Sequence, residues 1–181
     1  MENEVLSLIA SFLALVFVIF AYFTSKKNYL MFQSLCIVFL IISYFFKAQF
    51  FVAIGMIVSL GRSLTFYYFE SKDKEASILW SFMFSALTIA TYLIVNFAIL
   101  GDAKLLDIIC LCALILYAFI FRIRNLKIVR FTMLIPTGLS IIYNIASAMP
   151  IFAILSYSFE FVANIVSIIK YDVLGTKTQN K

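Results

Sequence analysis

Glu160 is the residue best placed to do chemistry in this sequence, because it is one carboxylate in the middle of an apolar segment, 150–171. In a helix, Ser156, Glu160, Asn164 and Ser167 share one face, so they form a polar stripe. An acid at the centre of a membrane helix costs about 2.5–3.5 kcal/mol, and such residues mark functional sites by default. The stripe therefore predicts a binding site for a solute or a proton. The alternative is a protonated Glu160 that only hydrogen-bonds a neighbouring helix.

Two neighbouring segments carry further candidates. Arg62 lies about two-thirds of the way along segment 50–69, and we expect it to face Glu160 or to share a water-filled cavity with it, because a buried unpaired charge is costly. Arg62 could instead extend to the headgroups. The segment 128–149 repeats the polar stripe with Arg130, Thr137, Ser140, Asn144 and Ser147.

The uncharged candidates suit a hydroxylated, heterocyclic or planar solute. Asn144 and Asn164 each offer hydrogen-bond donors and acceptors, although they can equally join helices together. Tyr44 and Tyr143 can stack on a planar ligand, and the alternative for both is anchoring at the membrane interface. The predicted substrate-binding set is therefore Glu160, Asn164, Asn144, Arg62, Tyr143 and Tyr44.

The sequence lacks the residues and motifs that several kinds of enzyme chemistry and metal binding require. The sequence has no histidine, which excludes a Ser-His-Asp triad and imidazole metal sites, and it has no Gly-rich phosphate loop. Cys36, Cys110 and Cys112 lie in apolar runs and form neither a disulfide framework nor a CxxC pair. We expect no catalytic residue, no metal and no cofactor, so the chain is not predicted to be an enzyme.

The composition indicates a membrane protein. Hydrophobic residues make up 65% of the 181 residues and charged residues 13%, against about 45–50% and about 25% in soluble domains. The sequence predicts an all-α polytopic membrane protein that is a single transmembrane domain, 1–181. Its seven predicted transmembrane helices are 5–23, 29–46, 50–69, 78–100, 105–121, 128–149 and 150–171. We expect Pro136 to kink or loosen the sixth.

The basic residues predict an orientation. If the loop after the first span is cytoplasmic, that face holds eleven of them: Lys26, Lys27, Lys72, Lys74, Arg122, Arg124, Lys127, Arg130, Lys170, Lys177 and Lys181. The opposite face holds Lys47 and Lys104. This positive-inside bias puts the N-terminus outside and the C-terminus inside, as an odd number of spans requires. The net charge of +5 thus reflects the orientation of the chain in the membrane, and we expect no nucleic-acid partner.

A weak internal repeat organises the spans. Lys27-Asn28-Tyr29-Leu30 resembles Arg124-Asn125-Leu126-Lys127, and Ile41-Ile42-Ser43-Tyr44 resembles Ser140-Ile141-Ile142-Tyr143 with a slip of two residues. We therefore predict a first three-helix repeat at 1–75, a connector helix at 76–104 and a second three-helix repeat at 105–172. Because the connector restores the orientation, the two repeats are parallel. Chance likeness between apolar helices is the alternative.

The chain resembles the bacterial inner-membrane YgjV family over residues 26–75 and 122–171. The resemblance is carried by the repeated motifs above together with Arg62, Ile142-Tyr143-Asn144 and the run Asn164–Lys170. The resemblance implies a multi-pass protein of the bacterial cytoplasmic membrane. That family's layout is similar in turn to the SWEET and PnuC transporters, although this chain lacks the Pro-Gln pair of many of those relatives. Fold analogy alone assigns no substrate.

The function we expect is a facilitator for a small polar or aromatic metabolite, with the lipid bilayer and that solute as partners. The sequence leaves a homo-oligomer or a membrane-protein partner open. The alternative is a non-transporting immunity or defence protein that recognises its partner within the bilayer. Polar stripes that converge on one cavity favour transport, whereas stripes that point outward favour a partner.

Overall fold

The computed structural model describes residues 2–22, 26–101, 105–123 and 125–173, and over these ranges it is all-helical. The helices are α1 (Glu2–Tyr22), α2 (Lys26–Phe46), α3 (Phe50–Ser71), α4 (Ile78–Leu93), α5 (Leu105–Ile120), α6 (Leu126–Ala146) and α7 (Ile151–Ser167). The π-helical segments η1 (Ile94–Ile99) and η2 (Ile168–Val173) extend α4 and α7. The all-α class and the seven helices are confirmed. The predicted turn at 101–104 and the tail at 172–181 lie largely outside the described residues.

Six of these helices are long and apolar enough to cross a membrane, and α5 is the exception. Its 16 residues span about 24 Å at a rise of about 1.5 Å per residue, which is less than a typical hydrocarbon core of about 30 Å. Thinning of the bilayer can accommodate such a helix. The described part of the chain therefore contains six membrane-length helices and one shorter apolar helix.

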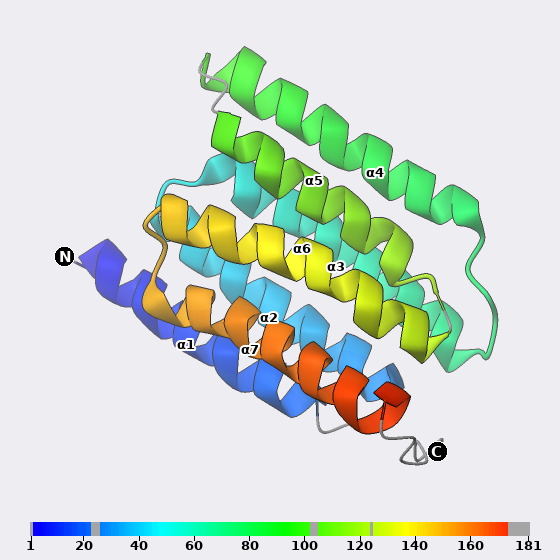
Figure 1. Ribbon diagram of the computed structural model, residues 1–181. Helices are drawn as coiled ribbons and strands as arrows, with labels where there is room; N and C mark the ends of the chain where they lie inside the picture. The colour runs from blue at the N-terminus through cyan, green and yellow to red at the C-terminus, as the bar shows by residue number, and fades with distance from the viewer. Residues whose placement is uncertain (1, 23–25, 102–104, 124, 174–181) are drawn as a thin grey trace.

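The helices lie roughly parallel in a bundle, with the N-terminus near one end and the C-terminus near the other (Figure 1). We call these ends the N-terminal end and the C-terminal end. Packing joins α1 to α2, α2 to α3, α3 to α5, α5 to α6, α6 to α7 and α7 back to α1. Six helices therefore form a closed ring, and α4 packs outside it against α3 and α5.

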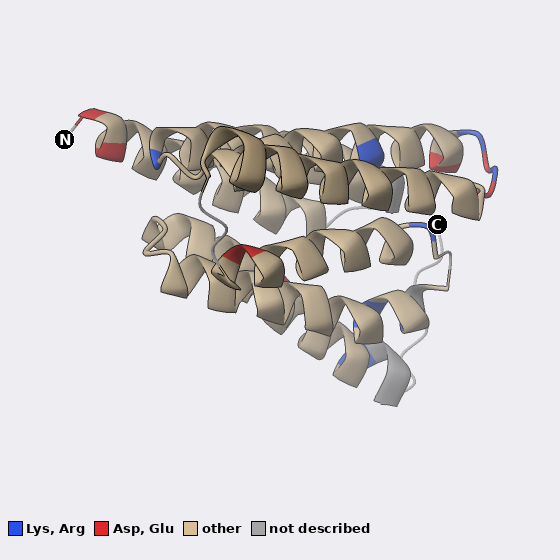
Figure 2. Ribbon diagram, turned by 90° about the horizontal axis from the view of Figure 1, so that it is seen from above, with Lys and Arg blue, Asp and Glu red and all other residues tan. Residues whose placement is uncertain are grey.

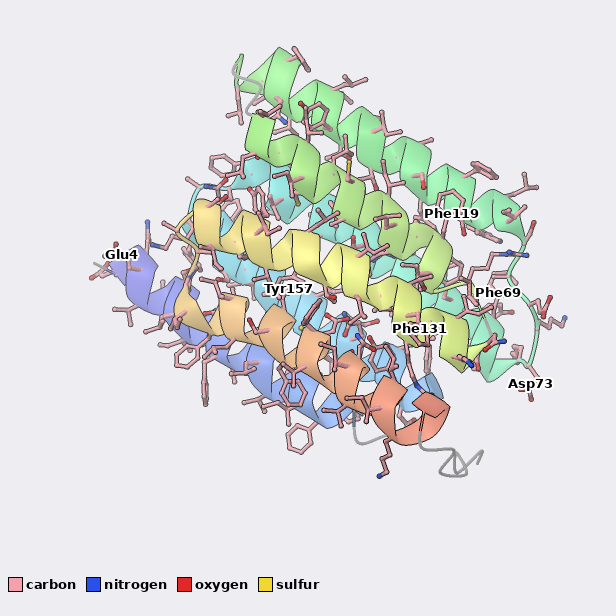
Figure 3. The ribbon with its side chains drawn as sticks, viewed as in Figure 1. Glu4, Phe69, Asp73, Phe119, Phe131 and Tyr157 are labelled. Atoms are coloured by element: carbon pink, nitrogen blue, oxygen red, sulfur yellow. The ribbon has the colours of Figure 1, made fainter. Side chains whose placement is uncertain are left out.

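The ring places apolar side chains outside and polar ones inside. Large exposed hydrophobic residues occur on all seven helices, for example Phe45, Phe82 and Ile135, whereas many of the polar side chains within the helices are buried. This distribution suits a lipid environment, in which polar groups must find partners inside the protein. Tyr157, for example, lies between the helices, whereas Glu4 and Asp73 lie at opposite ends (Figure 3).

Charges gather toward the two ends of the bundle. Acidic turns lie at the N-terminus, and most of the basic turns lie toward the C-terminal end (Figure 2). At the N-terminal end, Lys47 Nζ lies 4.0 Å from Glu4 Oε1. The loops that follow α3 and α5 are at the C-terminal end (Figure 1). Most of the described basic residues outside the helix interiors therefore lie toward the C-terminal end, as the charge count predicts.

Pro136 leaves α6 one α-helix from Leu126 to Ala146. The proline ring cannot donate to the carbonyl four residues earlier. The next residue, Thr137, is buried, and its hydroxyl donates to the Met133 carbonyl of the same helix, so the hydroxyl is satisfied locally. The helix therefore carries its polar face through the proline without a break.

Candidate functional site

A cavity of about 30 Å³ lies inside the six-helix ring, and we call it the central cavity; its lining is largely apolar with polar side chains among the apolar ones. Its polar lining comes from α2, α3, α5, α6 and α7: Gln33, Tyr44, Ser59, Arg62, Tyr117, Ser140, Tyr143, Asn144, Ser156, Tyr157 and Glu160. A water molecule needs about 10–15 Å³ by this measure, so the central cavity has room for about two. In this conformation it cannot hold a metabolite.

Five of the six residues in the predicted site line this cavity. Glu160, Arg62 and Asn144 meet there from three helices, and Tyr44 and Tyr143 complete the set. Asn164 does not line it; its amide donates instead to the Tyr22 hydroxyl at 3.1 Å. Asn164 therefore joins α7 to α1, which is the interhelical alternative. Of the two polar stripes, Ser140 and Asn144 of α6 and Ser156 and Glu160 of α7 line this cavity, whereas the other stripe residues do not.

Glu160 is 1% exposed, and two tyrosines, Tyr22 and Tyr29, hydrogen-bond to it. The Tyr29 hydroxyl donates to Glu160 Oε1 at 3.5 Å, a long hydrogen bond. Tyr22 donates to the main-chain carbonyl of Glu160 at 3.4 Å and packs edge-on against Tyr29, with ring centroids 5.6 Å apart. Helix α2 thus holds the Glu160 carboxyl group at the wall of the cavity, and α1 holds the main chain of α7 beside it.

Arg62 binds to α5 and not to Glu160. Its Nη1 donates to the Leu114 carbonyl at 3.0 Å, and its guanidinium carbon lies 5.7 Å and 5.2 Å from the ring centroids of Tyr117 and Phe121. Cation–π contacts of this length are favourable in a desolvated site. The side chain is 4% exposed, so it does not extend to the headgroups.

The direct ion pair that we expected is absent, since no salt bridge within 4.0 Å joins these two described residues. The reason is geometric: α3 packs on α5, whereas α7 packs on α1. Arg62 and Glu160 instead share the central cavity, which was the other form of the expectation.

Tyrosine and amide groups close the cavity toward the N-terminal end. The Tyr44 hydroxyl donates to Asn144 Oδ1 at 2.8 Å, which links α2 to α6 across the ring. The Tyr143 hydroxyl lies 3.3 Å from Gln49 Oε1 and 3.5 Å from Asp107 Oδ1, and can donate to either. Both tyrosines are 1% exposed, so neither anchors the protein at a membrane interface.

The sequence did not single out several lining residues. Three buried atoms at the cavity make no hydrogen bond to the protein, namely Gln33 Oε1, Arg62 Nε and the Tyr117 hydroxyl oxygen. Gln33 was visible as one amide in an apolar span, but Tyr117 and Tyr157 gave no signal in a sequence with 10 tyrosines. The three unused atoms and the Glu160 carboxyl can bind a polar solute.

The part of the chain that the structure describes contains no cluster of metal-binding side chains. No group of three His, Cys, Asp or Glu residues there is arranged to hold a metal ion. Cys36 and Cys110 are buried and line the central cavity, whereas Cys112 is exposed on the outside of α5. All three are free thiols.

No protein-family model, no curated protein and no solved structure matches this chain. The resemblance to the YgjV family therefore rests on the quoted sequence marks alone.

Proposed function

We propose that this protein is a facilitator-type transporter of a small polar or aromatic metabolite, and that the solute passes through the central cavity. One observation carries the proposal: a ring of apolar helices surrounds a cavity whose largely apolar lining contains polar side chains with unused hydrogen-bonding atoms. Buried polar atoms without partners are costly, and a solute that pairs with them repays that cost. Intramembrane polar residues that face a shared cavity are typical of solute pathways.

The two halves of the ring are proposed to be the parallel repeats, 1–75 and 105–172, with α4 as the connector in 76–104. Helices α2 and α6 are both 21 residues long, and position n of α2 corresponds to position n+100 of α6. The turns that follow them match too. Ala48 (φ 56°) and Ala148 (φ 50°) both adopt the left-handed conformation, and the next residue donates to the carbonyl of Tyr44 or Asn144.

Contacts within the halves support the same register. Ser7 Oγ lies 2.9 Å from Ser43 Oγ, and at the corresponding positions Asp107 Oδ1 lies 3.5 Å from the Tyr143 hydroxyl. The packing order agrees, because a two-fold axis along the helices exchanges the α3–α5 and α7–α1 junctions. Such an axis is typical of parallel transporter repeats. In this register Tyr44 corresponds to Asn144, not to Tyr143.

Transport through this cavity requires a conformational change. Its small volume and the Tyr44–Asn144 bond describe a closed state, in which the two halves meet toward the N-terminal end. Rocking of one half against the other would break these few hydrogen bonds and admit a solute. We propose that the N-terminal end faces outward across a bacterial cytoplasmic membrane, as the positive-inside rule implies.

Thiol labelling in membrane vesicles of both orientations tests this proposal. Cys36 and Cys110 line the cavity and report on its opening, and Cys112→Ala removes the exposed thiol. We expect an impermeant methanethiosulfonate reagent to modify the two cavity cysteines from either face, because each face opens in turn. Reaction from one face only, or from neither, would contradict a transport pathway.

The same labelling gives the orientation. Glu2→Cys and Lys74→Cys place single thiols at exposed positions near the two ends of the bundle, in a variant whose native cysteines are replaced by alanine. The Glu2 position should react in intact cells and the Lys74 position should not. The reverse pattern would overturn the proposed orientation while leaving the cavity result to stand by itself.

A further inference from the structure

A second cavity, of about 230 Å³, lies at the N-terminal end outside the central cavity, and we call it the side pocket. The α2–α3 turn, the start of α3, the π-helical segment η1 and α5 line it. Its main side chains are Gln49, Phe51, Asn96 and Asp107. Drug-sized sites measure about 300–1,000 Å³, so this pocket suits a smaller molecule.

Asn96 is the unexplained residue of the side pocket. Its side chain is 0% exposed, and neither its Nδ2 nor its Oδ1 makes a hydrogen bond to the protein. Leaving a buried polar group without a partner costs about 1–3 kcal/mol per group, and an apolar side chain would avoid that cost. The residue lies in η1, the π-helical end of the fourth helix.

The carboxamide of Asn96 defines the chemistry of a partner. It presents two N–H donors and one carbonyl acceptor in one plane, which matches a partner with an adjacent donor and acceptor. The Phe51 ring, which packs edge-on against Tyr92 with centroids 5.3 Å apart, adds an apolar aromatic wall. Planar molecules suit such a wall, because aromatic rings stack with an offset or edge to face.

We propose that the side pocket is a binding site for a small, planar, uncharged molecule with an amide or an amide-like heterocyclic edge, and that Asn96 pairs with that edge. The site is separate from the central cavity and does not depend on transport. The two are adjacent, because Tyr143 lines the central cavity while its hydroxyl contacts Gln49 and Asp107 of the side pocket.

Fluorine NMR of the protein in lipid nanodiscs tests this site with two probes. The first is 4-fluorobenzamide, which has the donor and acceptor edge. The second is 4-fluoro-N,N-dimethylbenzamide, which keeps the ring and the carbonyl but has no N–H. Protein-free nanodiscs give the baseline for partition into lipid. We expect the wild-type protein to broaden the fluorine signal of 4-fluorobenzamide. It should bind 4-fluoro-N,N-dimethylbenzamide at least tenfold more weakly than 4-fluorobenzamide.

Two variants complete the experiment. Asn96→Leu removes the carboxamide and should weaken binding of 4-fluorobenzamide at least tenfold, while the melting temperature stays equal or rises because no hydrogen bond is lost. Ser85→Ala is the matched control: Ser85 is a buried residue of α4 whose hydroxyl has no partner, and it lies away from the pocket. This control should bind as the wild type does.

Equal binding of the two probes by the wild type, or wild-type binding by Asn96→Leu, would overturn the assignment. Absence of 4-fluorobenzamide binding would overturn it too. The comparison of the two probes uses only the wild-type protein, so it decides the matter even if Asn96→Leu does not fold.

Discussion

Arg62→Gln should lower the stability of the folded protein by about 3 kcal/mol. The substitution removes a charged hydrogen bond to the Leu114 carbonyl, worth about 1.5–3 kcal/mol, and cation–π contacts worth up to about 2 kcal/mol. Release of the guanidinium from burial offsets part of this loss. Because these contacts hold α3 against α5, the ring is weakened where its two halves meet. A thermal shift in detergent should show a fall of about 6–12 °C.

A double-mutant cycle separates the cation–π contact from the rest. Tyr117→Leu removes one of the two rings, and its cycle with Arg62→Gln should give a coupling of about 0.5–2 kcal/mol. Arg62→Lys keeps the charge but not the planar group, so its stability should lie between that of the wild type and Arg62→Gln. An unchanged melting temperature for Arg62→Gln would refute the structural role that we assign to this residue.

Glu160→Gln should abolish most transport while leaving the fold intact. Glutamine has the same shape, and its carbonyl can still accept the long hydrogen bond from Tyr29, so stability should change by less than about 1 kcal/mol. What is lost is the carboxyl group at the cavity. Leaving a buried group of the solute without its hydrogen-bonding partner costs about 1–3 kcal/mol, so solute flux should fall about tenfold to hundredfold.

Ser158→Ala is the control on the same helix. The Ser158 hydroxyl donates to the Ile154 carbonyl at 2.9 Å and lies outside the central cavity, so flux should be unchanged. If Glu160→Gln transports like the wild type, the carboxyl group has no part in solute passage. If it unfolds, Glu160 serves the structure first.

The helices could be predicted from the sequence because apolar length is a local property. The predicted span 50–69 corresponds to the helix Phe50–Ser71 in the structure. The last span was predicted to begin at Pro150, and Pro150 is the N-cap of that helix. The faces were predictable too: Ser156, Glu160 and Asn164 are all buried, as a helical stripe requires. Helical periodicity therefore located both the membrane spans and their inward sides.

The partners of each side chain could not be predicted, because periodicity does not say which helix lies opposite. Arg62 and Glu160 were expected to pair, yet Arg62 bonds to α5 and the Glu160 carboxyl accepts from Tyr29 of α2. Asn164 has the same spacing as Glu160 but meets Tyr22 of α1. Asn96 appeared only as a polar residue near a span end, and its missing partners became visible only in the packed structure.

Solute equilibration across a membrane tests the central claim most directly. Purified protein in liposomes should speed the entry of at least one solute from a panel of sugars, nucleosides and aromatic amides. The final internal concentration should equal the external one, as facilitated diffusion requires. Glu160→Gln liposomes should equilibrate at least tenfold more slowly. Entry no faster than in empty liposomes for every solute, together with stable co-purification of a membrane protein, would contradict transport and favour the partner-binding alternative.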